Sequence, residues 1–352
     1  MAATLQDIAD RVGVKKSTVS VVLNNRTTAI KVSDGTRRRI YQAVKELDYH
    51  PNAAARALST RRTGHIAFIL SDTVAEAWGN AYYAQCLQGV EKACHERGYG
   101  LNITTYNLSN FETFVFPPRV GERTVDGLIL ADYAHAAVLK TFREFKIPFV
   151  SIGDDRELPE EAPSVVTDGV IEMGISFEYL AGLGHRRIAL HIPDRWRSRQ
   201  WAEEILAQLR IRPALAGCEL MPIVTPRQTA DYSDAPDLLN VWRGIEPARR
   251  PTAIMGGYQV ILGLLREMHR AGLRCPEDLS LISGFESPFC EATVPALTAL
   301  KQDVPNLGAK AASLLIDHIE GKAKLMNRNY TCDMNSSLVV RESCAPPNPT
   351  RA

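Results

Sequence analysis

The chain has 352 residues, of which 45% are hydrophobic and 23% are charged, the balance of a globular protein with more than one domain. We expect a cytoplasmic protein, since no apolar run approaches the roughly 18 residues that span a bilayer and the first ten residues lack a signal peptide. Seven cysteines lie far apart without a CxxC pair, which disfavours a disulfide framework and a metal site. No cofactor is expected.

The net charge of +1 hides an asymmetry along the chain. Residues 1–62 carry 12 Lys and Arg against 5 Asp and Glu, whereas residues 63–352 carry 29 against 35. A basic head on an acidic body suits a protein that meets a polyanion with its head alone. A solvated basic tail would have the same charge, so the pattern within the head must decide.

Three short helices are predicted in residues 1–48. Thr4 can cap the first helix, and Gly13 can adopt the positive φ of a tight turn after it. A second helix is expected at about 17–23 and a third from about Ser33. Three helices with a glycine turn between the first two make a helix-turn-helix DNA-binding domain, whose second helix enters the major groove.

A short helix is predicted in the segment 49–62, which follows the head. Pro51 suits a first helical turn, and the three alanines of 53–55 favour helix without offering a core. So short a helix is marginal alone and would fold when DNA or a partner chain stabilises it. An ordinary linker is the alternative.

The head resembles the lactose-repressor (LacI) family. The resemblance is carried by TLQDIADRVGVKKSTVSVVLNN at 4–25 and by VSDGTRRRIYQAVKELDYHPNAAARALS at 32–59. It implies that residues 49–62 are a hinge helix, that two hinges pair in the minor groove, and that Leu58 is inserted there as an apolar wedge. The DNA-binding residues that it implies, together with the exposed donors of the second helix, are Thr4, Lys15, Lys16, Ser17, Thr18, Ser20, Val21, Asn24, Pro51, Asn52, Arg56 and Leu58.

Val21 departs from the family pattern. The family has an arginine after the serine of its "TVSR" motif, and this chain has a valine. An arginine can contact guanine through two hydrogen bonds in the major groove, so the operator of this protein should differ from the family's usual one.

Strands and helices alternate from residue 63 onward. Alternating βα units predict parallel, doubly wound sheets, and two sets of them predict two lobes with a ligand cleft between them. The fold class is therefore an α-helical helix-turn-helix head plus an α/β core of two doubly wound lobes. The expected strands lie at 65–70, 101–106, 125–130, 148–152, 187–192, 220–224, 252–255 and 279–283, and the expected helices at 81–97, 175–183, 199–209 and 261–271.

The resemblance continues through the body in ERTVDGLIL, LAGLGHRRIAL, GLRCPEDLSLISGF and SSLVVRES. It implies an effector-binding and dimerisation core at 63–345, related to periplasmic sugar-binding proteins. In such a core the chain crosses between lobes three times, which we place near Ala162, Phe289 and Gly321. Lobe 1 would then comprise about 63–162 and 289–320, and lobe 2 about 163–288 and 321–345.

Seven residues are candidates for effector binding. Arg197 aligns with an arginine that holds ligand hydroxyls or carboxylates, although it could be exposed in RWRSR. Asp168 could instead cap a helix, and Tyr232 could lie on the surface. The full set, which includes two residues at the end of the first core strand, is Ser71, Asp72, Asp168, Arg197, Tyr232, Tyr258 and Glu286.

Tyr258 stands where the family has an acid that accepts hydrogen bonds from sugar hydroxyls. A phenol is bulkier, uncharged and flat, which favours a ligand with an apolar or aromatic face, or an anionic group held by Arg197. Alternatively, Glu286 or Asp168 supplies the acceptor in an ordinary sugar site. The segment 107–121 also departs from the family, since Pro117-Pro118 interrupts its usual helix.

Enzyme motifs are absent from the sequence: GxGxxG, GxxxxGK[ST], HExxH and GxSxG do not occur. We expect no catalysis but a sequence-specific transcription regulator, a repressor by the family's default. Its partners would be a pseudo-palindromic DNA operator, a second copy in a homodimer, and a small-molecule effector, a sugar or related metabolite. The alternatives are a binding protein without a regulatory role and a sugar-processing enzyme fused to a DNA-binding head.

Overall fold

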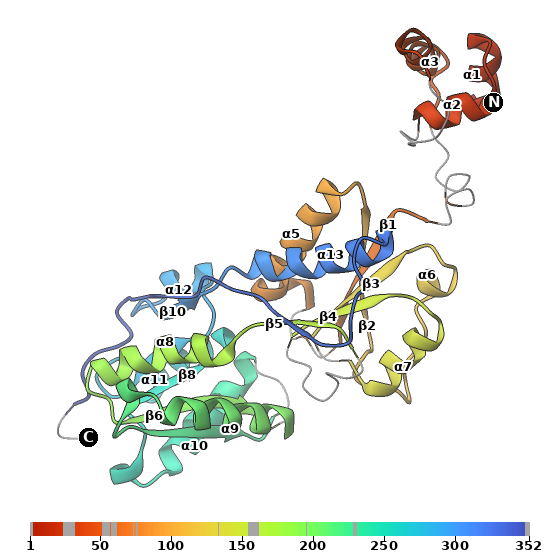
Figure 1. Ribbon diagram of the computed structural model, residues 1–352. Coiled ribbons are helices and arrows are strands. Elements are labelled where there is room, and N and C mark those ends of the chain that lie inside the picture. The colour runs from red at the N-terminus through yellow and green to blue at the C-terminus, as the bar shows by residue number, and fades with distance from the viewer. Residues whose placement is uncertain are drawn as a thin grey trace. The chain divides into compact units, whose positions relative to one another are not determined.

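The computed structural model describes residues 3–23, 32–50, 57, 62–72, 74, 77–132, 134–153, 162–194, 196–227 and 231–348, with the backbone alone at 196–198. The chain divides into two compact units, Met1–Thr63 and Gly64–Ala352, which Figure 1 shows and which are described separately. We call them the head and the core.

The head contains the three predicted helices, α1 (Leu5–Val12), α2 (Lys16–Leu23) and α3 (Asp34–Glu46). Thr4 caps α1 in a capping box with Asp7, which satisfies backbone amides that a helix start leaves unbonded. Gly13 follows with a φ of 72°, as the predicted tight turn requires. Ile8, Val19 and Ile40, one from each helix, are fully buried and form the centre of a small apolar core.

The core is built on two six-stranded sheets. Sheet A has the order β11-β5-β4-β3-β1-β2, and sheet B has the order β12-β10-β9-β8-β6-β7. All pairings within them are parallel except that of β10 with β12. The strands of sheet A are β1 (His65–Ser71), β2 (Gly100–Tyr106), β3 (Gly127–Ala131), β4 (Phe149–Ile152), β5 (Ser164–Val166) and β11 (Asn329–Thr331). Those of sheet B are β6 (Arg187–Pro193), β7 (Glu219–Thr225), β8 (Ala253–Gly256), β9 (Ser280–Ser283), β10 (Thr298–Lys301) and β12 (Ser337–Val339).

Helices cover both faces of each sheet, so the central strands are buried on both sides and read as continuous apolar runs. Around sheet A lie η1 (Ala77–Gly79), α5 (Ala81–Glu96), α6 (Pro118–Gly121), α7 (Ala136–Glu144) and α13 (Val304–Glu320). Around sheet B lie α8 (Gly169–Gly182), α9 (Trp196–Arg210), η2 (Pro213–Leu215), η3 (Tyr232–Asp234), α10 (Ala235–Gly244), η4 (Pro247–Arg249), α11 (Tyr258–Arg270) and α12 (Pro288–Ala292). With only four residues, α6 agrees with the predicted interruption at Pro117-Pro118.

The chain passes between the two lobes three times, at 167–168, 302–303 and 332–336, which we call the crossing segments. Each lies later than expected from the sequence. The crossing that we expected near Ala162 lies after β5 instead, because β5 still pairs with β4 and so belongs to sheet A. Those placed near Phe289 and Gly321 were wrong by about a dozen residues, because β10 still belongs to sheet B and β11 returns to sheet A.

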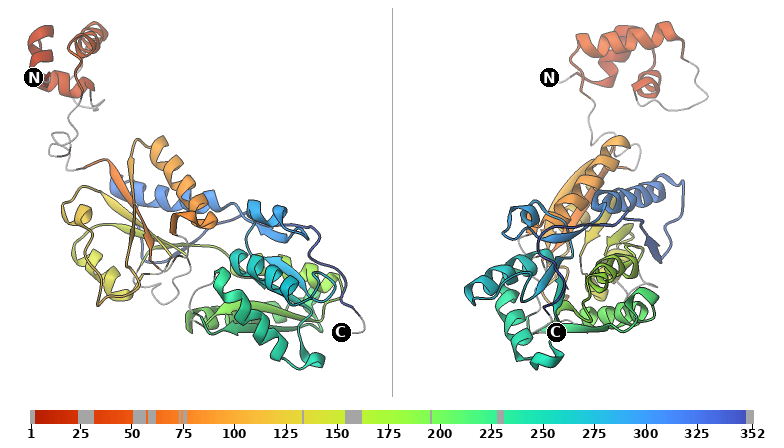
Figure 2. Two further views of the ribbon diagram at one scale, coloured as in Figure 1. Left: turned by 180° about the vertical axis from the view of Figure 1, so that it is seen from behind. Right: turned by 90° about the vertical axis from the view of Figure 1, so that its left-hand side faces the viewer.

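Helices α5 and α13 pack unusually closely in lobe 1, side by side in both views of Figure 2. A Cβ atom added at Gly89 would lie 1.8 Å from the carbonyl oxygen of Pro305, and one at Gly308 would lie 2.0 Å from that of Cys86. The two helix backbones are therefore in contact at these two glycines, which have no side chain to hold the helices apart. Arg97, just after α5, holds the far end through ion pairs to Asp317 and Glu320.

Candidate functional site

The start of α2 presents polar side chains to solvent. Lys15, Lys16 and Ser17 are exposed, and Thr18 and Ser20 are partly exposed. Val19 and Val22 point into the head's core, and Val21 between them is only partly buried. A helix N-terminus with ammonium and hydroxyl donors is suited to phosphates and base edges.

The remaining DNA-binding candidates divide into two groups. Thr4 has a structural role, because its hydroxyl accepts from the amide of Asp7 at 3.3 Å. The others lie outside the described residues and stay predictions: Asn24, Pro51, Asn52, Arg56 and Leu58.

A cavity of about 340 Å³ lies between the two lobes of the core. It adjoins the carboxyl ends of β6 and β8, where doubly wound sheets place their ligands. Lobe 1 contributes the start of α5, and lobe 2 contributes the rest. The lining residues are Asn80, Tyr82, Tyr83, Met173, Leu190, His191, Ile192, Pro193, Trp201, Met255, Gly256, Gly257, Tyr258, Gln259, Gly284 and Phe285.

Aromatic side chains from both lobes meet at this cavity. The ring of Phe285 packs edge-on against Tyr258 and against Tyr82, with centroids 5.6 and 5.5 Å apart. Tyr83 packs edge-on against Tyr82 and donates its hydroxyl to Asp132 at 2.8 Å. Burial raises the pKa of both Tyr82 and Tyr83 well above the usual value, so both phenols are neutral at pH 7.

Polar residues line the cavity from both lobes: Asn80, Tyr82 and Tyr83 from lobe 1, and His191, Tyr258 and Gln259 from lobe 2. Gln259 is buried, and its Nε2 has no hydrogen-bond partner among the described residues. The Nε2 of His191 lies 2.9 Å from the hydroxyl of Thr225, which donates to the fully buried Asp234 at 2.8 Å. Because an unpaired buried donor costs free energy, Gln259 is a natural position for an acceptor on a ligand.

Of the predicted effector residues whose side chains are described, only Tyr258 lines this cavity. Ser71 is buried at the end of β1 and donates to Asp72 at 3.3 Å. Asp72 in turn accepts from the amides of Leu108 and Ser109, so it fastens the loop after β2. The expectation that these two side chains contribute to the cavity does not hold.

Three further candidates also have structural partners. Asp168 caps α8 by accepting from the amides of Val170 and Ile171, which was the alternative considered for it. Glu286 is held by the guanidinium of Arg341 at 2.6 and 2.9 Å and is not among the residues that line the cavity. Tyr232 lies in η3 outside the lining set. Arg197 belongs to α9, and its side chain lies outside the described part of the structure.

The sequence pattern identified Tyr258 but missed Gln259, the next residue. Both begin α11 just after β8 and Gly257, and a signal was available, since doubly wound sheets bind ligands at the carboxyl ends of their strands. The Tyr82-Tyr83 pair at the start of α5 was also missed. Its signal was two adjacent aromatic residues in the first turn after the β1 loop.

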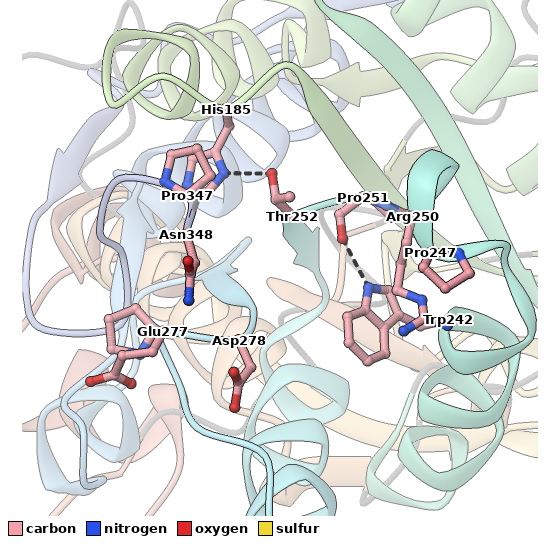
Figure 3. A pocket seen from close by; sticks show the side chains of 11 residues that line it. His185, Trp242, Pro247, Arg250, Pro251, Thr252, Glu277, Asp278, Pro347 and Asn348 are labelled. Carbon is pink, nitrogen blue, oxygen red and sulfur yellow. Dashed lines mark hydrogen bonds between the residues drawn. The ribbon is translucent and has the colours of Figure 1, made fainter. Parts of the chain in front are cut away.

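A second cavity, of about 250 Å³, lies in lobe 2 (Figure 3). Most of its polar side chains are already engaged within the fold. His185 lies 2.8 Å from the hydroxyl of Thr252, and the indole of Trp242 donates to the carbonyl of Pro251 at 2.9 Å. The Arg250 guanidinium lies over the Trp242 ring. This cavity therefore offers little to a ligand.

No helix among the described residues is long and apolar enough to cross a membrane. Within the same ranges, no three His, Cys, Asp or Glu side chains gather as they would around a metal ion.

Comparison with known proteins gives matches in both units. Residues 4–52 match the model of the lacI family of bacterial regulatory proteins. Residues 177–344 match that of a periplasmic binding protein-like domain. The chain is 28% identical over 358 aligned positions to the HTH-type transcriptional repressor PurR of Escherichia coli, and the alignment covers 97% of each.

Solved structures resemble the chain over the same extent. One is a complex of the transcriptional regulator CelR with cellobiose, at 26% identity and a TM-score of 0.65, covering 97% of this chain and 99% of that one. Another is the lac repressor dimer bound to operator and the anti-inducer ONPF, at 24% identity and a TM-score of 0.72, covering 98% and 100%. Because the similarity runs through head and core alike, the chain belongs to the LacI family of DNA-binding transcription regulators.

Proposed function

We propose that the cavity between the lobes binds the small-molecule effector that controls operator binding by the head. The observation that carries this assignment is a cavity lined by both lobes at the carboxyl ends of β6 and β8, beside the buried Gln259, whose Nε2 has no partner among the described residues. A ligand there would contact α5 of one lobe and α11 of the other. It would therefore favour one arrangement of the lobes over another, as effector control requires.

The effector that suits this cavity is a small ring-shaped metabolite with one apolar face. Tyr258, Phe285 and Tyr82 offer flat apolar surfaces, and Gln259 offers a donor to a hydroxyl or carbonyl oxygen. No carboxylate belongs to the lining set drawn from the described residues. A sugar that stacks one face on these rings fits, as does a heteroaromatic compound. The cavity volume of about 340 Å³ limits the ligand to roughly one or two rings.

We infer that α2 reads the operator through Lys15, Lys16 and Ser17, with Thr18, Ser20 and Val21 beside them. Lys15 lies just before α2, and the other five lie on the part of α2 that the head's core leaves accessible. Asn24 and the hinge residues Pro51, Asn52, Arg56 and Leu58 complete the proposed interface. One recognition helix reads one half-site, so the protein would act as a homodimer on a pseudo-palindrome. It would work in the cytoplasm, without catalysis.

The test begins with an unidentified effector and operator. A thermal-shift screen of the full chain would use sugars, sugar phosphates, nucleosides and organic acids, and sequence selection from random DNA would define the operator. A compound that raises the midpoint of thermal unfolding should also change the affinity of the protein for the operator, as measured by fluorescence anisotropy. Light scattering should show a dimer both with and without the compound.

Site variants then locate the ligand. Gln259→Leu should reduce affinity for the compound by about tenfold or more, because a lost hydrogen bond to a buried ligand costs about 1.5 kcal/mol. Asn348→Ala, in the second cavity of lobe 2, is the matched control and should bind normally. Normal binding by Gln259→Leu would place the effector elsewhere. Turnover of the compound would favour the enzyme alternative, and binding without any change in operator affinity would favour a binding protein with no regulatory role.

A further inference from the structure

Glu172 is a buried carboxyl that effector binding does not explain. It lies in the first turn of α8, and only 5% of the residue is exposed. Its Oε2 accepts from the hydroxyl of Thr167 at 3.1 Å, and its Oε1 accepts from the hydroxyl of Ser336 at 3.3 Å. The side chain of Gln302 forms a third hydrogen bond to it.

These three partners come from the three places where the chain changes lobe. Thr167 belongs to the first crossing segment (167–168), Gln302 to the second (302–303) and Ser336 to the third (332–336). They are far apart in the sequence, yet all three converge on the carboxyl group of Glu172. Any rotation of one lobe against the other must bend these segments, because they are the covalent connections between the lobes.

Backbone hydrogen bonds tie the crossing segments to one another as well. The amide of Cys332 donates at 2.7 Å to the carbonyl of Val166, the residue just before the first crossing segment, and the amide of Asp303 donates to that of Met334 at 2.8 Å. These bonds join the segments in pairs. Glu172 differs because it contacts all three at once.

The carboxyl group is kept there at an energetic cost. Burial raises the pKa of Glu172, and the neighbouring titratable groups are Asp168 at the start of its own helix, Tyr82 on α5 and Cys332 on the third crossing segment. None of these three carries a positive charge. The stabilisation of the carboxylate that opposes burial comes from the hydrogen bonds of the crossing segments themselves.

We propose that Glu172 clamps the three crossing segments together and so sets the angle between the two lobes. The clamp adjoins the effector cavity, since the next residue, Met173, lines that cavity and Tyr82 reaches both. Its action does not depend on the identity of the effector. The clamp holds the lobes in one arrangement, and a ligand that moves them must work against it.

The experiment measures the distance between the lobes in the full chain without any ligand. Spin labels on genetically encoded keto amino acids, which avoid the native cysteines, would replace Lys140 on α7 and Glu203 on α9, both exposed. Electron–electron double resonance then gives the distance distribution. The variants are Glu172→Ala and Glu172→Gln, and the matched control is Glu178→Ala. Glu178 also lies on α8, but it pairs with Arg212 of the same lobe at 2.6 Å.

We expect Glu172→Ala to shift and broaden the distance distribution. The population of other lobe angles should rise about fivefold for each hydrogen bond lost, because a bond worth about 1 kcal/mol corresponds to that ratio. Glu172→Gln should give a smaller shift without loss of thermal stability, because an uncharged amide keeps some of the bonds and escapes the cost of burying a charge. Glu178→Ala should lower stability and leave the distribution unchanged.

If Glu172→Ala does not fold, Ser336→Ala and Thr167→Val decide, since each removes one hydrogen bond from one crossing segment. Both should shift the distribution in the same direction. The proposal would be overturned if every folded variant of Glu172, Ser336 and Thr167 gave the same distance distribution as the unsubstituted chain. Glu172 would then be a merely structural residue. The outcome is independent of whether an effector or operator is found, so it is separable from the proposed function.

Discussion

The hydroxyl oxygen of Tyr258 accepts a hydrogen bond from the backbone amide of Ala81, 3.3 Å away. This bond joins the first turn of α11 in one lobe to the first turn of α5 in the other. The amide of Ala81 belongs to a helix start, where backbone donors have no partner within the helix. Tyr258 is thus both a wall of the effector cavity and a contact between the lobes.

Replacement of Tyr258 separates these two roles. Tyr258→Phe should lower the stability of the core by about 1 kcal/mol, because the amide of Ala81 loses its partner while the ring stays against Phe285. Tyr258→Asp should cost about 3 kcal/mol, because it removes a buried ring. Urea unfolding midpoints measure both, and an unchanged midpoint for Tyr258→Phe would show that the bond contributes nothing. With an effector identified, calorimetry on Tyr258→Asp should show more than a twofold change in affinity, or about 0.4 kcal/mol.

The close contact between α5 and α13 predicts a strong effect of one methyl group. Gly308→Ala should destabilise the core by about 2 kcal/mol or more, because the new Cβ would meet the carbonyl oxygen of Cys86 and force the helices apart. Gly182→Ala is the control, since its Cβ would enter open space at the end of α8 and should be neutral or slightly stabilising. Equal melting temperatures for the two variants would contradict this account of the packing.

His185 predicts a loss of stability in mild acid. Burial lowers the pKa of His185 to about 4 from its usual 6.5. Between these values the unfolded chain binds a proton that the folded chain does not, so stability is full above pH 6.5 and falls as the pH drops toward 4. The loss amounts to about 3 kcal/mol. In urea titrations from pH 7.5 to 4.5, His185→Gln should lose less stability than the unsubstituted chain, and parallel curves would show that His185 does not contribute.

Val21 predicts the operator's departure from the family consensus. Val21→Arg should add a guanine contact and shift base preference at one position in each half-site by about 1–3 kcal/mol. Gln42→Arg adds the same charge on the exposed face of α3, and it should raise non-specific affinity alone. Sequence selection with each variant gives the comparison. The same preferred site for Val21→Arg and the unsubstituted chain would mean that position 21 does not face the groove.

Local patterns were sufficient to predict most elements. The run Ile66–Leu70 within β1 is apolar throughout, as a strand covered on both faces must be, and Gly98 ends the helix before β2. The helices α7, α10 and α13 were nevertheless missed. The crossings were misplaced because β5, β10 and β11 have only three or four residues each. So short a strand is defined by its partner in the sheet rather than by its own sequence.

The site was predicted less completely than the fold, for a similar reason. The family pattern pointed to Tyr258, which begins α11 with only Gly257 between it and the end of β8. It could not show that Glu286 would be neutralised by Arg341, a residue 55 positions away, because that pairing exists only after β9, β10 and β12 have assembled. The cavity's unpartnered Gln259 donor is likewise a property of the packed core.

The repeated passage of the chain between lobes also determines the order in which the head and the core can fold during synthesis on the ribosome. The head can complete its apolar core once α3 has emerged, whereas sheet A waits for β11 and sheet B for β12. Roughly 290 residues separate these events, which at 5–20 residues per second amounts to about 15–60 s. During that interval a finished DNA-binding head would be tethered to an unfinished core that cannot yet pair or sense. Nascent chains arrested after residue 320 should accordingly have a protease-resistant head and a digestible core. Chains arrested on an added C-terminal extension that lets residue 345 leave the ribosome should resist digestion in both.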